Sequence, residues 1–127
     1  MNKKAISTTK APAAIGPYSQ AIQTGDLLFI SGQLPLDPET GAMVEADIGA
    51  RTHQIMKNIK AIVDEAGANL NKVVKTTIFL TDLSDFQEVN QAYGEHFEDT
   101  PPARSTVQVA ALSLGSNIEI ESIISLT

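Results

Sequence analysis

Two segments of this chain would, as extended strands, carry apolar side chains on both faces. In residues 27–31, Leu-Leu-Phe-Ile-Ser, the first and third side chains point to one side and the second and fourth to the other. Residues 73–80, Val-Val-Lys-Thr-Thr-Ile-Phe-Leu, are rich in β-branched residues and are also apolar on both sides. Such strands are typical of a sheet that is buried on both faces. The fold must therefore supply cover on each side of its sheet.

The rest of the pattern predicts three strands, a helix, a strand, a second helix and two final strands. Asp47 is an expected helix N-cap, apolar residues follow it at helical spacing, and Gly67 is a natural stop. Ser84 and Gln87 form a capping-box pattern that opens the second helix. The expected strands are residues 5–9, 19–24, 27–31, 73–80, 105–109 and 118–126, in the order β-β-β-α-β-α-β-β.

Two helices can cover only one face of such a sheet. We therefore expect an α/β (α+β) fold, a six-stranded mixed sheet with two helices on one face. Because large open apolar patches are rare on monomers, the second face is expected to be covered by another subunit. The chain has 127 residues and neither an internal repeat nor a linker, so we expect a single domain over residues 1–127.

Composition argues against several classes of function. The net charge of −6 at pH 7 argues against a broad nucleic-acid-binding face. The absence of cysteine rules out disulfides, thiolate catalysis and cysteine-ligated metals. The N-terminal lysines are not followed by an apolar core, and the longest apolar runs are far too short to span a bilayer. We expect a soluble cytoplasmic protein.

The segment Pro101-Pro102-Ala103-Arg104-Ser105-Thr106 holds one of only two arginines in the chain at the start of a strand. Each proline ring sets φ and removes a backbone donor, so the segment is rigid and non-helical. A guanidinium held in this way suits a planar anion such as a carboxylate. A surface arginine or a structural ion pair is the alternative interpretation.

Strand parity predicts what lies beside this arginine if the last two strands pair antiparallel. The apolar faces to be matched comprise Ser105, Val107, Val109, Ile118, Ile120 and Ile124. The opposite face then comprises Arg104, Thr106, Gln108, Glu119 and Glu121. A salt-bridged subunit interface explains this set, and so does a pocket between subunits. In the pocket, the arginine would anchor an anion and a glutamate would handle a water or a proton.

Other polar side chains are weaker candidates. Tyr18 follows Gly16-Pro17 in a rigid connector, Ser31 ends an apolar strand, and Asn90 interrupts the apolar face of the second helix. Each either lines a pocket or has a structural role. His53 and His96 fall on different helices without metal-ligand spacing, so we expect no metal site. Phosphate-loop, nucleophile-elbow and dinucleotide glycine patterns are absent.

Several of these segments together resemble the RidA (YjgF, reactive intermediate deaminase A) family. The matching stretches are Ala-Ala-Ile-Gly-Pro-Tyr-Ser-Gln-Ala (13–21), Phe-Ile-Ser-Gly-Gln (29–33), Asp-Phe-Gln-Glu-Val-Asn (85–90), Pro-Ala-Arg-Ser (102–105) and Ile-Glu-Ile-Glu (118–121). The resemblance covers essentially the whole chain, and the combination is specific. It implies a chorismate-mutase-like subunit in a homotrimer, with sites at the subunit interfaces.

The resemblance also implies hydrolysis of enamines and imines of 2-amino acids, typified by 2-aminoacrylate, to 2-oxo acids and ammonia. This is the reaction of a 2-iminobutanoate/2-iminopropanoate deaminase, and it links the protein to the pyridoxal-phosphate dehydratases that release such intermediates. By motif, Arg104 matches the substrate-carboxylate anchor, and Glu119 matches the residue that positions the attacking water. The other substrate-binding positions are Tyr18, Ser31, Gly32 (through its backbone), Asn90 and Thr106.

An imine is already electrophilic, so this chemistry needs no metal or covalent cofactor, only a carboxylate and a water held in register. Thr106 stands where many family members carry cysteine, so behaviour tied to that thiol is not expected here. One alternative function is a non-catalytic module that binds a small carboxylate at the same cleft. Another is an endoribonuclease or translation inhibitor, against which the acidity, the two arginines and the lack of a suitably spaced histidine pair count.

Overall fold

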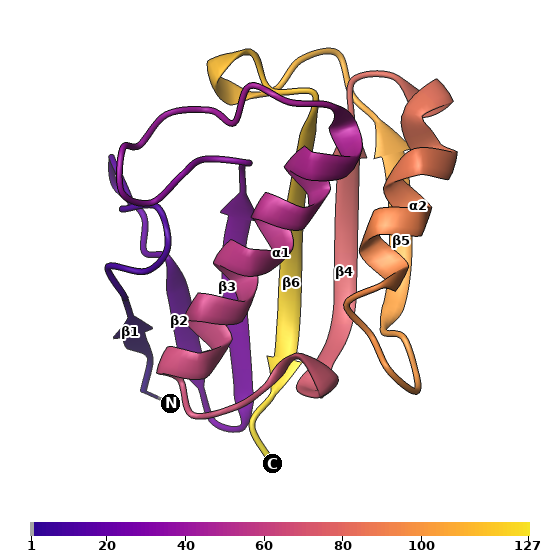
Figure 1. Cartoon of the computed structure of the whole chain (residues 1–127). Helices are drawn as coiled ribbons and strands as arrows, with labels where there is room; N and C mark the ends of the chain where they lie inside the picture. The colour runs from indigo at the N-terminus through magenta and orange to yellow at the C-terminus, as the bar shows by residue number, and fades with distance from the viewer. Residues whose placement is uncertain (1) are drawn as a thin grey trace.

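The computed structural model describes residues 2–127, which form a six-stranded sheet and two α-helices (Figure 1). The strands are β1 (Lys4–Ile6), β2 (Ala21–Thr24), β3 (Leu27–Gln33), β4 (Val73–Leu80), β5 (Ala103–Gln108) and β6 (Ile118–Ser125). The helices are α1 (Ile48–Glu65) and α2 (Phe86–Gly94), and 3₁₀ turns occur at Leu70–Lys72, Leu83–Asp85 and Ser113–Gly115. The order of elements along the chain is the predicted one.

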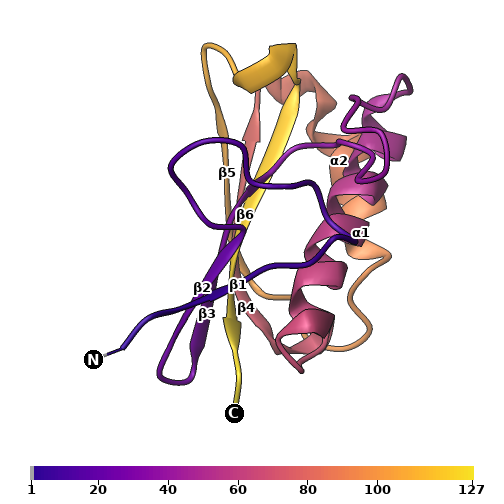
Figure 2. The ribbon, with the colours of Figure 1, turned by 90° about the vertical axis from the view of Figure 1, so that its left-hand side faces the viewer.

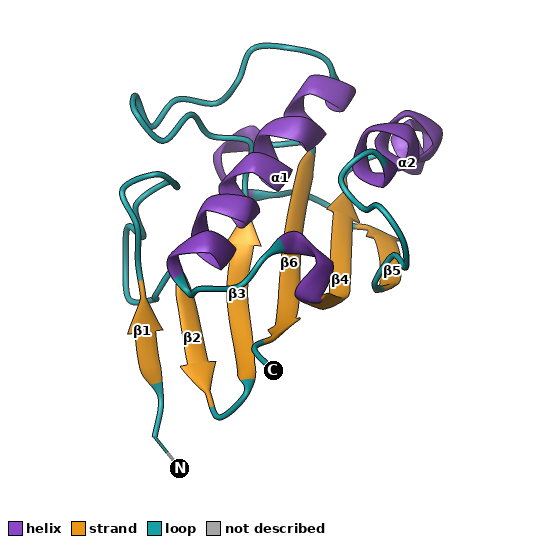
Figure 3. Ribbon diagram, turned by 60° about the horizontal axis from the view of Figure 1, so that its bottom comes forward, coloured by secondary structure: helices purple, strands orange, loops and turns teal. Residues whose placement is uncertain are grey.

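The molecule has two layers, the sheet and a layer of helices on one side of it (Figure 2). The strands lie in the order β1-β2-β3-β6-β4-β5, and only β4 and β5 are parallel neighbours. Helix α1 crosses the middle of the sheet, while α2 lies over β4 and β5 (Figure 3). We call the side toward the helices the covered face and the other side the open face. The prediction of a mixed sheet with two helices on one face is confirmed.

The hydrophobic core lies between α1 and the covered face. Ile118, Ile120 and Ile124 of β6 are fully buried there, in one cluster with Ile55 and Ile62 of α1. Full burial of each such side chain stabilises the fold by about 1.5–3 kcal/mol. These side chains are two or four residues apart in the strand and seven apart in the helix, spacings that keep them on one side of each element.

The predicted start of α1 is confirmed and that of α2 is wrong. The Asp47 carboxylate accepts from the N–H of Ala50, 2.8 Å away, and caps α1. Before α2, the Asp82 carboxylate accepts from the N–H of Ser84 and begins a 3₁₀ turn that leads into the helix. Ser84 therefore lies inside that turn and does not form a capping box with Gln87, because the neighbouring aspartate takes the capping role.

The predicted pairing of the last two strands is also wrong. Strand β5 pairs in parallel with β4, and β6 lies between β3 and β4, antiparallel to both. The physical reason is the connection: parallel neighbours need a crossover, and α2 supplies it between β4 and β5. Strand β6 is left to close the centre of the sheet, where its run of buried isoleucines is in contact with α1.

The open face keeps the apolar residues that the two-sided strands predicted. Leu27 and Phe29 of β3 are 40% and 41% exposed. Their neighbours Leu28 and Ile30, which point to the covered face, are buried. Val107 of β5 lies on the open face too and is 42% exposed, so its expected place on the buried face is wrong, because β5 pairs with β4 and not with β6. One chain therefore covers only one side of its sheet. Within residues 2–127, no helix is long and apolar enough to cross a lipid bilayer.

Candidate functional site

Arg104 is the second residue of the edge strand β5, and its side chain lies on the covered face beside α2. It pairs with Thr76 of β4 in the parallel ladder, and paired residues of neighbouring strands point to the same face. Thr76 is 1% exposed, with its hydroxyl beneath α2. Pro101 and Pro102 bring the chain into β5 from the loop that follows α2.

Three side chains of α2 hold the guanidinium. Arg104 Nη1 donates to Asn90 Oδ1 at 2.7 Å, and the guanidinium carbon lies 5.4 Å from the centre of the Phe86 ring and 5.3 Å from that of Tyr93. The Tyr93 hydroxyl is itself fixed by a 2.6 Å hydrogen bond with Thr76 Oγ1. Burial raises the pKa of the Tyr93 hydroxyl, so that group stays protonated and the ring stays neutral. Cation–π contacts and an amide oxygen thus orient Arg104 without neutralising it.

The two arginines of the chain have different roles. Arg51 Nε donates to the carbonyl of Val44 and Arg51 Nη1 donates to Asn117 Oδ1, both at 2.9 Å, so Arg51 fastens loops. Arg104 forms no ion pair with any residue of 2–127. The structural ion pair that the sequence left open as an alternative is therefore not formed within the described chain.

A hollow of about 440 Å³ opens beside Arg104. Its lining consists of Asn90, Tyr93, Gly94, Phe97, Pro101, Pro102 and Arg104. This volume lies within the usual range for small-molecule sites, and the walls combine apolar rings with one free cation and one amide. Such a hollow suits a small molecule with a carboxylate and a short carbon chain.

Glu119 lies near the start of β6, with its side chain on the open face. A Cβ atom added to Gly32 would collide with the Glu119 carboxylate, so glycine at this position leaves the space that the carboxylate occupies. Burial, and after it the neighbouring Glu121, raise the pKa of Glu119. Glu119 forms no ion pair within residues 2–127. A half-buried carboxylate without a cation is suited to accept a proton.

Ser31 and Tyr18 lie further along the sheet and take part in local hydrogen bonds. The Ser31 hydroxyl donates to the carbonyl of Ser19 at 2.6 Å and holds the end of β3 to the connector before β2. The Tyr18 hydroxyl accepts from the N–H of Ile15 at 3.4 Å, and the Tyr18 side chain is 53% exposed. Ser31 is half-buried on β3, which β6 and β4 separate from the β5 edge where Arg104 lies.

Thr106 follows Arg104 on the same side of β5. Its Oγ1 atom is buried and has no hydrogen-bond partner among the described residues. Buried hydroxyls are usually bonded, so an unpaired one marks a place where a partner is missing.

The structure divides the predicted site residues into groups that one chain does not bring together. Arg104, Asn90 and Thr106 lie at the β5 edge of the covered face, whereas Gly32 and Glu119 lie on the open face at the centre of the sheet. The prediction that Arg104 and Glu119 share a face is wrong. It assumed that β5 and β6 are neighbours, but β4 separates them, and the parallel register turns Arg104 to the covered face.

Two contributors were missed by the sequence interpretation. Phe86 and Tyr93 belong to the apolar helix face that Asn90 interrupts, yet their rings frame the guanidinium. Their signal was present, because Phe86, Asn90 and Tyr93 follow one another at spacings of four and three on one helix face. The sequence pattern does not show that this face of α2 packs beside β5.

Comparison with known proteins places these features in a family. The family model described as endoribonuclease L-PSP matches residues 8–126. A mouse protein named 2-iminobutanoate/2-iminopropanoate deaminase is 50% identical over 121 residues, which cover 95% of this chain and 90% of that protein.

Two solved structures have the same fold. RidA from an Antarctic Psychrobacter species superposes with a TM-score of 0.93 at 49% identity, covering 96% of this chain and 98% of that one. TdcF from E. coli, solved with bound serine, superposes with a TM-score of 0.91 at 42% identity, covering 98% of this chain and 99% of that one.

Proposed function

The chain belongs to the RidA (YjgF) family, which the endoribonuclease L-PSP model describes, and on this premise we propose that it is an imine deaminase. The reaction adds water to the C=N bond of a 2-imino acid and releases a 2-oxo acid and ammonia. The mouse relative is named for this reaction with 2-iminobutanoate and 2-iminopropanoate. Enamines such as 2-aminoacrylate enter the reaction after tautomerising to the imine.

The observation that carries the proposal is the free guanidinium of Arg104. It is aimed by Asn90 and two aromatic rings at a hollow of about 440 Å³ and has no carboxylate partner within residues 2–127. A substrate carboxylate can bind this guanidinium through two parallel charge-assisted hydrogen bonds. TdcF, which shares the fold, was solved with serine, a small molecule that carries such a carboxylate.

Glu119 is the proposed general base. Its raised pKa makes it a better proton acceptor than an exposed glutamate, and Gly32 leaves space at its carboxylate. Glu119 takes a proton from water as the water oxygen bonds to the imine carbon, and it returns that proton to the nitrogen, giving a carbinolamine. Glu119 then takes the hydroxyl proton and passes it to the amino nitrogen, and the C–N bond breaks as the carbonyl forms and ammonia leaves. The C=N bond is electrophilic by itself, so no cofactor takes part in the proposal.

We further propose that each site lies between two subunits of a homotrimer. Arg104 and Glu119 point to opposite faces of one sheet, and no substrate a few ångströms long can touch both within one subunit. The exposed apolar residues of the open face support burial against another copy. In this assembly, Arg104 of one subunit holds the carboxylate that lies over Glu119 of the next.

The remaining proposed substrate contacts come from both groups of residues. Asn90 and Thr106 belong with Arg104, and the unpaired Thr106 hydroxyl is free to accept or donate. Ser31 and Tyr18 belong with Glu119, together with the backbone of Gly32. No residue in this proposal is a thiol, in keeping with a chain that has no cysteine.

The proposal also places the protein beside the enzymes that generate its substrate. Pyridoxal-phosphate dehydratases acting on serine or threonine release enamines of this class, and we propose a cytoplasmic location with them. Residues 1–127 are proposed to form one domain of this family. Co-fractionation with a serine dehydratase activity in cell extracts tests the location.

The structure favours imine hydrolysis over the two alternative functions. A binding module needs Arg104 but has no use for a carboxylate with a raised pKa, so Glu119 favours the enzyme. For a ribonuclease, the expectation that the chain lacks a suitably spaced histidine pair is wrong, because His53 and His96 are in contact. They are hydrogen-bonded at 2.8 Å, which leaves no space for a phosphate between them, and Glu95 lies beside them.

The test generates 2-aminoacrylate with a serine dehydratase and follows its decay with and without this protein. We expect faster formation of pyruvate, no acceleration by Arg104→Ala, and strongly reduced acceleration by Glu119→Gln. Arg51→Ala is the matched control, because it removes the other arginine, and it should keep its activity if it folds. Binding of 2-oxobutyrate without any acceleration would favour the binding module instead.

Subunit mixing tests the position of the site. When Arg104→Ala and Glu119→Gln chains are refolded together in equal amounts, random assembly of a symmetric oligomer leaves about one quarter of the sites with both residues intact. Recovery of roughly that share of wild-type activity is expected. A site built within one subunit gives no recovery, since every chain then lacks one residue.

A further inference from the structure

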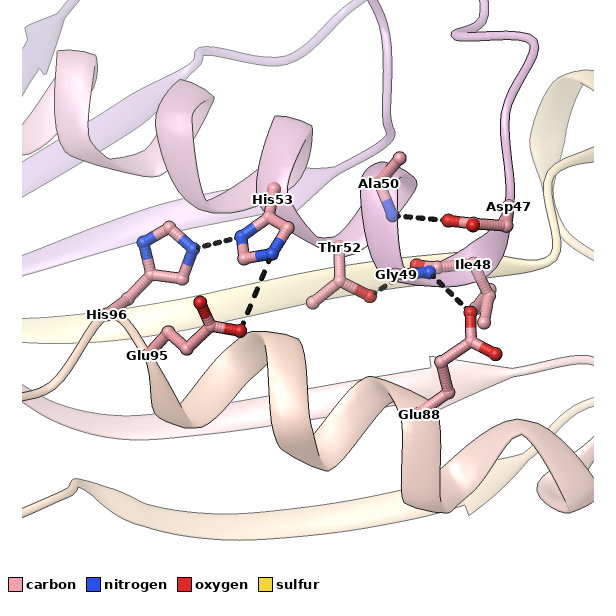
Figure 4. A network of polar contacts seen from close by, with 9 residues as sticks. All are labelled: Asp47, Ile48, Gly49, Ala50, Thr52, His53, Glu88, Glu95 and His96. Atoms are coloured by element: carbon pink, nitrogen blue, oxygen red, sulfur yellow. Dashed lines mark hydrogen bonds and ion pairs between the residues drawn. The ribbon is translucent and has the colours of Figure 1, made fainter.

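The chain contains two histidines, and the fold brings them into direct contact. His53 lies on α1 and His96 lies in the turn after α2, 43 residues later. Figure 4 shows the rings facing each other, with His53 Nδ1 and His96 Nε2 2.8 Å apart. At this distance one nitrogen donates and the other accepts, so the two rings share one proton. The contact is a hydrogen bond between α1 and the segment that follows α2.

His96 lies within the segment that forms one side of the hollow beside Arg104. Tyr93, Gly94 and Phe97 line that hollow, and we call residues 93–97 the wall. The N–H of His96 donates to the carbonyl of Tyr93 at 3.2 Å. The Tyr93 and Phe97 rings pack against each other, with their centres 4.9 Å apart. A displacement of His96 would therefore displace the wall and, with Tyr93, one of the rings that hold the guanidinium.

Two hydrogen bonds join α1 to α2 and the turn after it, one near each end of α2. Near its start, the Glu88 carboxylate accepts from the N–H of Gly49 at 3.1 Å (Figure 4). Near its other end, the bond between His53 and His96 makes the connection. Only the second of these bonds lies beside the wall, and its two partners are imidazole rings that titrate in the mildly acidic range.

The two rings can take up two further protons, and their hydrogen bond survives only the first. One added proton charges one ring, which still donates to the lone pair of the other. Glu95 Oε2 lies 3.8 Å from His53 Nε2 and favours this charge on His53. A second proton leaves two N–H donors facing each other without an acceptor, and the two like charges repel. The doubly charged pair therefore separates.

The surroundings of the pair determine when the second proton binds. Burial, and after it the neighbouring His53, lower the pKa of His96, whereas Glu95 raises it. The stability that the bond contributes is therefore complete above the ordinary histidine pKa of 6.5 and is lost as the pH falls through the lowered pKa of His96. The hollow that His53 borders is also lined by Asp47, Glu88 and Glu95. The next charged residues along the two segments are Lys57, Glu98 and Asp99.

We propose that the hydrogen bond between His53 and His96 is an acid-sensitive clasp that positions the wall of the Arg104 hollow. When both rings are charged, the end of α2 separates from α1, the wall shifts, and the affinity for the substrate carboxylate falls. Neither histidine lines the hollow, so both are positioning residues. The effect on substrate rests on the proposed deaminase function, whereas the opening of the clasp does not.

The first experiment follows the histidine rings of the ligand-free protein by nuclear magnetic resonance between about pH 8 and about pH 4. Because the chain has no other histidine, all the imidazole signals belong to this pair. We expect two separate titration steps, with the amide signals of residues 93–97 shifting chiefly in the second. Rings that titrate independently, or wall amides that do not respond to the second step, would overturn the proposal. This measurement needs no variant.

Variants separate the charge of the rings from their hydrogen bond. In the double variant His53→Asn with His96→Gln, amide groups take the places of Nδ1 and Nε2, so the pair can still bond but cannot be charged. The wall amides of this variant should not shift with pH. Glu95→Gln removes the carboxylate that favours protonation and should move the second step to lower pH.

Steady-state kinetics of imine hydrolysis measure the effect on substrate. His53→Ala should raise KM about three- to tenfold at neutral pH, as expected for the loss of one hydrogen bond, with a much smaller change in kcat because Glu119 is untouched. Glu65→Ala is the matched control, because it truncates an exposed side chain at the far end of α1 and should leave KM unchanged.

The pH dependence of KM decides whether the clasp acts on the site. In the wild type, KM should rise as the pH falls through the second titration step, and this rise should be absent from the double variant with the two amides. The same rise in both proteins would overturn the proposal. If the protein hydrolyses no imine, the deaminase function fails, and binding of 2-oxobutyrate measured by calorimetry across the same pH range takes the place of KM. The clasp itself then stands or fails by the ring and wall signals.

Discussion

The covered and open faces of the sheet are built from the same strands but from different chemistry. On the covered face, Ile118, Ile120 and Ile124 of β6 are fully buried beneath the helices. On the open face, the same strand presents Glu119, with its raised pKa, and the half-buried Ile123. Alternate residues of one strand thus contribute to the stability of the subunit and to a candidate site.

This difference between the two faces predicts whether a substitution affects the stability of the subunit or its assembly. The covered face is completed within one chain, so changes there should lower the free energy of unfolding. The open face leaves Leu27, Phe29 and Val107 about two-fifths exposed, so changes there should act on assembly and, through assembly, on activity. The following predictions either break this division or sharpen it.

The largest effect is expected for Phe29→Glu on the open face. A charge without a partner in the proposed subunit interface costs several kcal/mol, so the proposed oligomer should dissociate and the activity should fall to background. Light scattering should show the mass of one chain, and circular dichroism should show an intact fold. Phe29→Leu is the control that keeps an apolar side chain and should keep the assembly. An active monomeric Phe29→Glu would contradict the shared site.

A smaller effect separates two isoleucines of the same strand. Ile120→Ala on the covered face should lower the free energy of unfolding by about 2–5 kcal/mol, because it leaves a cavity in a core that α1 closes. Ile123→Ala on the open face should cost much less in the monomeric Phe29→Glu background. Urea unfolding of both variants in that background gives the comparison. Equal losses would show that the open face also stabilises the isolated subunit.

Tyr93→Phe tests the edge of the covered face. The change removes the hydroxyl that bonds to Thr76 and leaves the buried Thr76 Oγ1 unsatisfied, at a cost of about 1–3 kcal/mol. The ring remains beside Arg104, so KM should change little. Thermal unfolding and steady-state kinetics measure the two effects separately. A large rise in KM with unchanged stability would mean that the hydroxyl, and not the ring, holds the guanidinium.

The smallest effect concerns pH and Glu119. Because its pKa is raised in the folded chain, the base is protonated at a higher pH than an exposed glutamate, and activity should decline early on the acid side. The same shift means that the stability contributed by this group is complete below the unfolded pKa and is lost as the pH rises through the folded pKa. Glu121→Gln removes one cause and should move the acid limb to lower pH. A limb that does not move would exclude Glu119 as the titrating base.

Local pattern predicted most of the fold. The bounds of β4 coincide with the predicted residues 73–80, and α1 begins after Asp47 as predicted, since both depend on periodicity and capping within a few residues. The partner of β5 was not predictable in this way. The alternation of side chains along a strand fixes which residues share a face, but it does not fix which strand is the neighbour. The neighbour of β5 depends on the crossover helix that connects it to β4.

The same limit applies to the site. The residue types of Arg104 and Glu119 point to an anion anchor and a base, and the resemblance named their positions. Their placement on opposite faces could not be read from the sequence, because it follows from the insertion of β6 between β3 and β4. The meeting of His53 and His96 was missed for a similar reason, since spacing along one helix cannot reveal a contact between two elements.

The position of β5 at the edge of the sheet has a consequence for hydrogen exchange. Strand β5 has a ladder with β4 alone, whereas β4 and β6 each have a strand on both sides. Edge segments with fewer protected amides open more often than central ones. Arg104, the proposed carboxylate anchor, therefore belongs to one of the less protected strands, and a bound 2-oxo acid should slow amide exchange in β5 more than in β4 or β6.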